Sequence, residues 1–156
     1  MRLRINGVFP FLHLKNNNKN NKNMKAGLYF EEISGYVKGH YGICPQLKKV
    51  DGKTLEVSYT PGRFIPAIKL VAKIEAVRKD VVCMSYDCSK AVGLIIAGLV
   101  CHLEGKMPEG IEINTEDKRI NLFLERINEI DKVMTYLQLN DICVNEDGIE
   151  ISAILK

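Results

Sequence analysis

The sequence contains no apolar run long enough to cross a bilayer in a helix, which takes roughly 18 to 20 residues. It also lacks a secretory signal, because Pro10 and His13 interrupt the apolar residues near the amino terminus and no small-residue cleavage site follows. These absences exclude the membrane-spanning and secreted classes. They predict a cytoplasmic protein without a membrane partner.

Short motifs for zinc and nucleotides are missing too. The five cysteines include no Cys-x-x-Cys pair, and an odd number in a chain without a signal is typical of a reducing compartment. No Gly-x-x-x-x-Gly-Lys-Ser/Thr motif is present, and the glycines of residues 35–42 have the wrong spacing for a dinucleotide fingerprint. Neither structural zinc nor a nucleotide cofactor is indicated.

Acidic residues are absent from residues 1–23, which carry five basic ones. Without those five, 17 of the 22 basic residues remain against 19 acidic residues, so the rest of the chain has a net charge of −2. This balance removes the electrostatic argument for a nucleic-acid-binding body. Residues 15–23 are a low-complexity run of Asn and Lys. We therefore predict a disordered basic, Asn-rich extension over residues 1–23 and one domain over residues 24–156.

Hydrophobic periodicity and turn residues predict the elements of this domain. The predicted strands are Lys25–Val37, which turns at Ser34–Gly35 into Tyr36–Ile43, then Thr54–Tyr59, Val81–Tyr86 and Gly110–Asn114. The predicted helices are Pro66–Lys79, Ala91–Cys101 with Ser89 as its cap, and a long helix that Asn114 caps and that runs through Leu137. A hairpin that turns at Asp147–Gly148 ends the chain.

This order predicts an α/β domain with a mixed five-stranded sheet, in which an antiparallel meander precedes parallel βαβ units and the C-terminal hairpin follows. It resembles the ribonuclease H-like fold over about residues 25–98. The segments that carry the resemblance are Gly27–Glu31 as first strand, Gly39–Gly42 as second-strand entry, Gly62–Val77 as first helix and Met84–Val92 as the fourth strand entering its helix.

The resemblance implies a metal-dependent nuclease or a nucleic-acid-binding module. Such nucleases hold two divalent cations, here Mg²⁺ or Mn²⁺, between carboxylates. The matching acids are Glu31 and Asp87, with Glu116 or Asp117 from the last helix, and we take Asp117 as the third. The family's first-helix glutamate has no counterpart at the aligned turn, residues 63–66. Metal chemistry is therefore altered or lost, and Asp87 has the alternative of capping the turn or the helix that follows it.

Cys88 offers a different chemistry. It stands at the start of a predicted helix, where backbone N–H groups and the helix dipole favour a thiolate, so a thiol-dependent enzyme is an alternative. His40 and His102 are candidate bases, but no spacing in the sequence places either beside Cys88.

Two binding hypotheses remain. Tyrosines interleaved with basic residues in Tyr36–Tyr41 could stack on single-stranded nucleic acid, although an ordinary exposed strand has the same composition. The helix within residues 90–103 is apolar all round, which is typical of the interior or of an interface. The second pattern predicts a non-catalytic scaffold subunit that forms a homo-oligomer through this helix. The sequence alone leaves open whether the protein is an enzyme.

Overall fold

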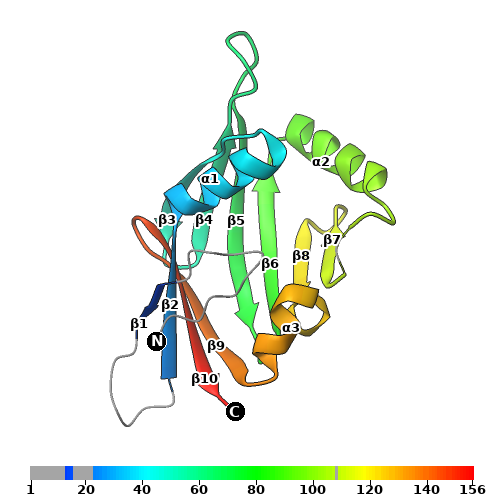
Figure 1. Ribbon diagram of the computed structural model, residues 1–156. Helices are drawn as coiled ribbons and strands as arrows, with labels where there is room; N and C mark the ends of the chain where they lie inside the picture. Colours follow the sequence, from blue (N-terminus) through cyan, green and yellow to red (C-terminus); the bar gives the residue numbers. More distant parts are fainter. Residues whose placement is uncertain (1–12, 16–22, 108) are drawn as a thin grey trace.

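The computed structural model describes residues 13–15, 23–107 and 109–156, and its strands form two antiparallel sheets (Figure 1). The four-stranded sheet has the order β1 (His13–Lys15), β2 (Asn23–Tyr29), β10 (Gly148–Leu155), β9 (Leu137–Val144). The six-stranded sheet has the order β3 (Gln46–Asp51), β4 (Thr54–Tyr59), β5 (Ile68–Val77), β6 (Val81–Cys88), β8 (Arg119–Phe123), β7 (Ile111–Asn114). The helices are α1 (Phe30–Tyr41), α2 (Lys90–His102), the 3-10 turn η1 (Leu124–Arg126) and α3 (Asn128–Met134).

The predicted α/β class is wrong. Each strand pair in both sheets is antiparallel, and no parallel βαβ unit occurs in the described residues. The connections explain this, because β5 and β6 are separated by only three residues and parallel neighbours need a crossover of a dozen or more. The fold is therefore not ribonuclease H-like.

The largest local error is β5, which we predicted as a helix over Pro66–Lys79. Its apolar residues fit two periods, since positions 68, 71, 72 and 76 suit a helix and positions 68, 70, 72, 74 and 76 suit a strand. The structure follows the strand period, because this segment pairs with a strand on each side. Ala72 lies opposite Leu55 on β4 and opposite Tyr86 on β6. Lys69, Lys73 and Glu75 alternate with these residues and are exposed.

The opposite error is α1, which we predicted as the second half of the strand Lys25–Val37, turning at Ser34–Gly35 into the strand Tyr36–Ile43. Glu32 in its first turn accepts a hydrogen bond from the backbone N–H of Tyr29 at 3.1 Å. Gly42 ends the helix at φ 70°, and its N–H donates to the carbonyl of Lys38 at 3.0 Å. These end signals outweigh the strand propensity of the tyrosines between them.

The long helix predicted after Asn114 is also wrong. Asn114 instead accepts the backbone N–H of Asp117 at 2.9 Å within a tight turn, and Lys118 follows at φ 53°. The chain then returns as β8, where Ile120 pairs with Met84 on β6 and Ile113 on β7. Only residues 128–134 of the predicted helix form α3.

Other predictions are confirmed. Strand β4 spans Thr54–Tyr59 as expected, and β6 lies inside its sheet between β5 and β8. The Ser89 hydroxyl accepts the backbone N–H of Val92 at 3.3 Å and caps α2. Strands β9 and β10 form the C-terminal hairpin.

The predicted disordered extension contains strand residues, since residues 13–15 form β1 and Asn23 begins β2. Its other residues, 1–12 and 16–22, lie outside the described residues.

Strand register separates an apolar face of the six-stranded sheet from a polar one. The apolar face contains the cross-strand neighbours Leu55, Ala72 and Tyr86. The polar face contains the cross-strand neighbours Lys73, Ser85 and Arg119. The buried apolar residues are Phe30, Ala72, Val82, Tyr86, Val92, Met134, Leu139 and Val144. No large side chain of the described residues is less than 2 % exposed, so the core is shallow.

Backbone hydrogen bonds from β9 join the two sheets. The N–H of Leu139 donates to the carbonyl of Lys79 in the β5–β6 turn at 3.0 Å. Farther along the strand, the N–H of Val144 donates to the carbonyl of Gly52 in the β3–β4 turn at 2.8 Å. Both turns lie at the same end of the six-stranded sheet, and the opposite end carries the long β4–β5 loop, the start of α2 and the β7–β8 turn (Figure 1).

Candidate functional site

The three predicted carboxylates lie on different elements. Glu31 is exposed in the first turn of α1, Asp87 is near the end of β6, and Asp117 is in the β7–β8 turn. The Asp87 carboxylate is 88 % exposed and lies 3.6 Å from the Lys118 ammonium. Asp117 is held by Asn114, whose side-chain amide donates to it at 3.1 Å. Asp87 therefore has an ion-pair partner, and Ser89 caps the helix in its place.

The described residues contain no group of three or more His, Cys, Asp or Glu side chains that could hold a metal ion. Glu116, the other acid considered for the third position, is exposed in the same turn as Asp117. Two-metal chemistry needs carboxylates gathered on one pair of cations. The geometry gives no support to the Mg²⁺ or Mn²⁺ site that the resemblance implied.

The thiol hypothesis finds no support in the geometry either. Cys88 is half-buried at the end of β6. His102 is the last residue of α2, which places it about 20 Å along the helix from the Cys88 end. The His40 ring stacks on Tyr36 with centroids 4.0 Å apart, and its Nδ1 atom lies 2.9 Å from the Tyr36 carbonyl oxygen. No base is thus shown beside the Cys88 sulfur.

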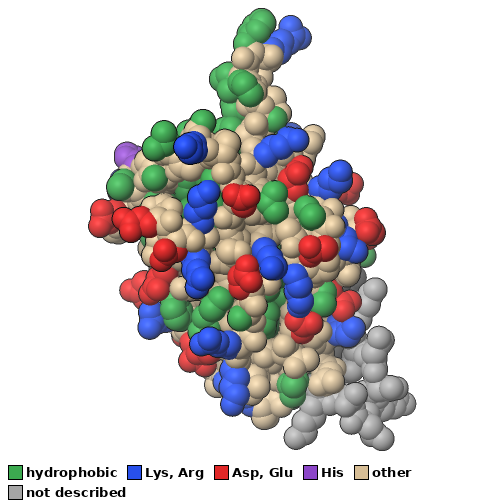
Figure 2. Space-filling model, turned by 180° about the vertical axis from the view of Figure 1, so that it is seen from behind, with side chains coloured by type: hydrophobic (Ala, Val, Ile, Leu, Met, Phe, Trp, Pro, Cys, Tyr) green, Lys and Arg blue, Asp and Glu red, His purple; other side chains and the backbone are tan. Residues whose placement is uncertain are grey.

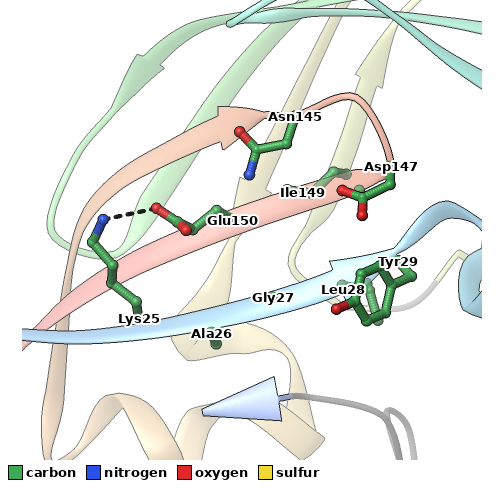
Figure 3. Close-up of a pocket in the computed structure, with 10 residues that line it drawn as sticks. Lys25, Ala26, Gly27, Leu28, Tyr29, Asn145, Asp147, Ile149 and Glu150 are labelled. Carbon is green, nitrogen blue, oxygen red and sulfur yellow. Dashed lines mark hydrogen bonds and ion pairs between the residues drawn. The ribbon is translucent and has the colours of Figure 1, made fainter. Parts of the chain in front are cut away.

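A small depression lies between β2 and the β9–β10 turn (Figure 3). Lys25 and Glu150 point toward each other at one side and form an ion pair of 2.9 Å, which raises the pKa of Lys25 through the hydrogen bond to Glu150. The cavity volume is about 120 Å³, well below the 300–1,000 Å³ typical of ligand pockets. It contains none of the predicted site residues, and it is too small for a cofactor.

The most unusual surface belongs to α2. Its exposed residues recur at helical spacing and form one stripe. We call Ala91, Leu94, Ile95, Gly98, Leu99 and His102 the α2 stripe. Leu94 is 75 % exposed, Ile95 47 % and Leu99 55 %. Large aliphatic side chains are thus presented to solvent along the full length of the helix.

The other side of α2 faces the protein. Val92 is buried, and Ile96 and Val100 are half-buried one and two turns later. Both sides of the helix are therefore apolar, which is what the sequence pattern showed, but only one side is covered. The fold of one chain covers one side of this helix, and the interface predicted for residues 90–103 stays a prediction.

The β4–β5 loop extends the apolar surface. Its base is next to the start of α2, because Leu70 near the beginning of β5 pairs with Cys88 at the end of β6. Phe64 is 98 % exposed and Ile65 54 % exposed in this loop. Figure 2 shows the loop projecting from the body with hydrophobic side chains along it, whereas the sheet below carries intermixed charges of both signs.

Sequence reasoning identified the composition of α2 but could not find the exposed stripe. Apolar residues on all sides of a helix do not reveal which side the fold covers. Phe64 and Ile65 were assigned to the turn before a helix, because the β5 segment was misread, so their projection on a long loop was missed entirely. No helix in the described part of the chain is long and apolar enough to span a membrane.

Comparison of this chain with family models, with curated proteins and with solved structures found no match.

Proposed function

We propose that this protein is a non-catalytic interaction subunit that self-associates through the α2 stripe. The observation that carries the proposal is the exposure of Leu94, Ile95 and Leu99 on one side of a helix whose other side is already packed. The candidate carboxylates form no metal-binding group in the described residues, whereas the apolar side chains of α2 line one exposed side of the helix. All five cysteines are free, which suits the reducing cytoplasm that the sequence predicts.

The energetics favour covering this surface. Burying one Leu or Ile side chain contributes about 1.5–3 kcal/mol, and a two-fold symmetric contact counts each residue twice. Monomeric proteins seldom expose apolar patches beyond about 300–600 Å². The stripe exposes three large aliphatic side chains on one helix, in a chain whose core is shallow. Association therefore supplies burial that the single chain does not achieve.

A second copy of the chain suits this surface better than a lipid bilayer does. The stripe has no Lys or Arg between Ala91 and His102, whereas helices that lie on membranes carry such residues beside their apolar face. An uncharged aliphatic stripe is by contrast complementary to itself.

Sedimentation velocity over a range of concentrations tests the proposal. The native chain of 17.6 kDa should sediment with twice the monomer mass at high concentration. Leu94→Glu should raise the dissociation constant by about 100-fold or more, because the dimer loses two buried leucines and gains two buried charges. Tyr136→Glu is the matched control, since Tyr136 is 70 % exposed between α3 and β9 and does not belong to the α2 stripe. This variant should sediment with the same mass as the native protein.

A monomer at every concentration would overturn self-association. If that monomer also bound vesicles of phosphatidylcholine and phosphatidylglycerol, and Leu94→Glu abolished the binding, the α2 stripe would be a membrane contact instead. If Tyr136→Glu dissociated the dimer and Leu94→Glu did not, the interface would lie elsewhere.

A further inference from the structure

The geometry points to an antiparallel arrangement of two α2 helices about a two-fold axis near Gly98, with Lys90 of each copy beside the partner's Glu104. This inference rests on the proposed self-association and specifies its partner as a second copy in a fixed orientation. Three features of α2 carry it: its central glycine, the charges at its ends and the position of the β4–β5 loop.

Gly98 is near the middle of the exposed stripe. A Cβ atom at this position would meet nothing within 4 Å, so the space above it is open. Without a side chain, the backbone at Gly98 allows a second helix to approach closely, and Leu94, Ile95 and Leu99 then pack around the contact. Small residues at a crossing point favour a short interaxial distance, which increases dispersion contacts along both helices.

Lys90 and Glu104 are the exposed charged residues nearest to the two ends of the α2 stripe, since Asp87 before the helix is already paired with Lys118 and Lys106 lies farther from the helix end. Lys90 is exposed at the first position of the helix, and Glu104 is exposed just after its last. Ala97 is midway between them in sequence, next to Gly98. An antiparallel pair centred there brings each lysine beside a glutamate, whereas a parallel pair brings lysine beside lysine and glutamate beside glutamate. Antiparallel packing also opposes the two helix dipoles.

The β4–β5 loop supplies area that a helix pair alone lacks. A helix of 13 residues is about 20 Å long, and two such helices bury less than the roughly 800 Å² per partner of a standard interface. The loop base adjoins the N-terminal end of α2. In the antiparallel arrangement the C-terminal end of the partner's α2 lies at this position, so Phe64 and Ile65 can pack beside it.

Charge reversal tests the orientation. Lys90→Glu and Glu104→Lys should each weaken the dimer by about 5-fold or more, and the double variant should restore the dissociation constant to within about 2-fold, as expected for desolvated pairs of 1 kcal/mol or more across a two-fold axis. Lys132→Glu on α3 is the matched control and should change nothing. Two single losses without recovery in the double variant would overturn the pairing.

Cysteine crosslinking gives an independent test, in a Cys44→Ser/Cys101→Ser background that removes the two exposed thiols. Ala91 and His102 lie on the stripe six residues before and five residues after Ala97, the midpoint between Lys90 and Glu104. Oxidation of a mixture of the Ala91→Cys and His102→Cys proteins should therefore join the two, as identified by mass spectrometry of the linked peptides. Each protein alone should crosslink poorly, because identical positions are then about 15 to 18 Å apart along the axis.

Strong crosslinking of each protein alone would show a parallel pair and overturn the inference. Absence of crosslinks in a protein that still sediments as a dimer would show that α2 is not at the contact. The first result leaves self-association through the α2 stripe standing. The second overturns the α2 stripe as the interface of a protein that still self-associates, and a native protein that is monomeric before oxidation overturns the proposed function as a whole.

Discussion

The Lys53 ammonium donates a hydrogen bond of 2.5 Å to the Asp141 carboxylate and so connects the β3–β4 turn of one sheet to β9 of the other. The same ammonium donates to the carbonyl of Ile142, and the Cys143 thiol lies 3.3 Å from the second Asp141 oxygen. The hydrogen bond from Lys53 lowers the pKa of Asp141, and burial raises the pKa of Cys143. Together with the Lys49–Glu146 ion pair of 3.3 Å, this contact links side chains of the two sheets.

Stability should therefore depend on the charge of Asp141. Because its pKa is lower in the folded chain than in the unfolded one, the stabilisation is fully present above the unfolded value of about 4 and is lost as the pH falls through the folded value. Asp141→Asn should cost about 0.5–1 kcal/mol at pH 7, a modest amount because both side chains are about 40–45 % exposed.

Urea unfolding between pH 3 and pH 7 measures this dependence. The difference in unfolding free energy between the native protein and Asp141→Asn should stay constant from pH 7 to about pH 5 and shrink below about pH 4. A Lys53→Met variant should show the same loss at pH 7. A difference that grew on acidification would contradict the assignment.

Gly148 should be intolerant of any side chain. A Cβ atom there would overlap the carbonyl oxygen of Leu28 and lie 3.0 Å from the Cα atom of Tyr29, because β10 and β2 approach closely where the hairpin turns. Gly148→Ala should cost about 2–4 kcal/mol in thermal or urea unfolding.

Gly27 on the neighbouring strand is the matched control, since a Cβ atom there would meet nothing within 4 Å. Gly27→Ala should be neutral or stabilise by about 0.5 kcal/mol, because alanine loses less backbone entropy on folding. Equal effects of the two substitutions would show that the β2–β10 contact is not as close as described.

Divalent cations should leave the protein unchanged. A site filled at 100 times its dissociation constant would add about 2.7 kcal/mol, which thermal unfolding detects easily. With Mg²⁺ or Mn²⁺ at millimolar concentration we expect no shift, and Asp87→Asn should behave like the native chain because its carboxylate is 88 % exposed. A cation-dependent rise in melting temperature that Asp87→Asn removed would instead support the metal site predicted from the sequence.

The sequence predicted those elements whose signals were local. Ser89 before an apolar run, Asp147–Gly148 between alternating strands, and the period-two pattern of Thr54–Tyr59 each marked their structure correctly. In β5, residues 68–77 satisfied helical and strand periods together, and only pairing with β4 and β6 decided between them. The error at β5 then produced the wrong fold class, since a helix between strands implies a crossover.

The candidate site was predicted only in part, for a related reason. The sequence showed that α2 is apolar on every side, and from this pattern we predicted a contact between two copies of the chain at residues 90–103. It could not show that Val92 faces the protein while Leu94 faces solvent, because that depends on how α2 leaves the end of β6. Asp87 and Asp117 were chosen as site residues because we expected the ribonuclease H-like topology. The sheet is antiparallel, so they do not hold the positions that this topology predicts.

Hydrogen–deuterium exchange of the α2 peptide as a function of protein concentration tests self-association most directly. The helix has one side open in the single chain, so its amides should exchange through local fraying at low concentration and become slower as dimers form. The β6 peptide of the same sample should show no such dependence. Exchange of α2 that is equally fast at every concentration would contradict self-association through this helix.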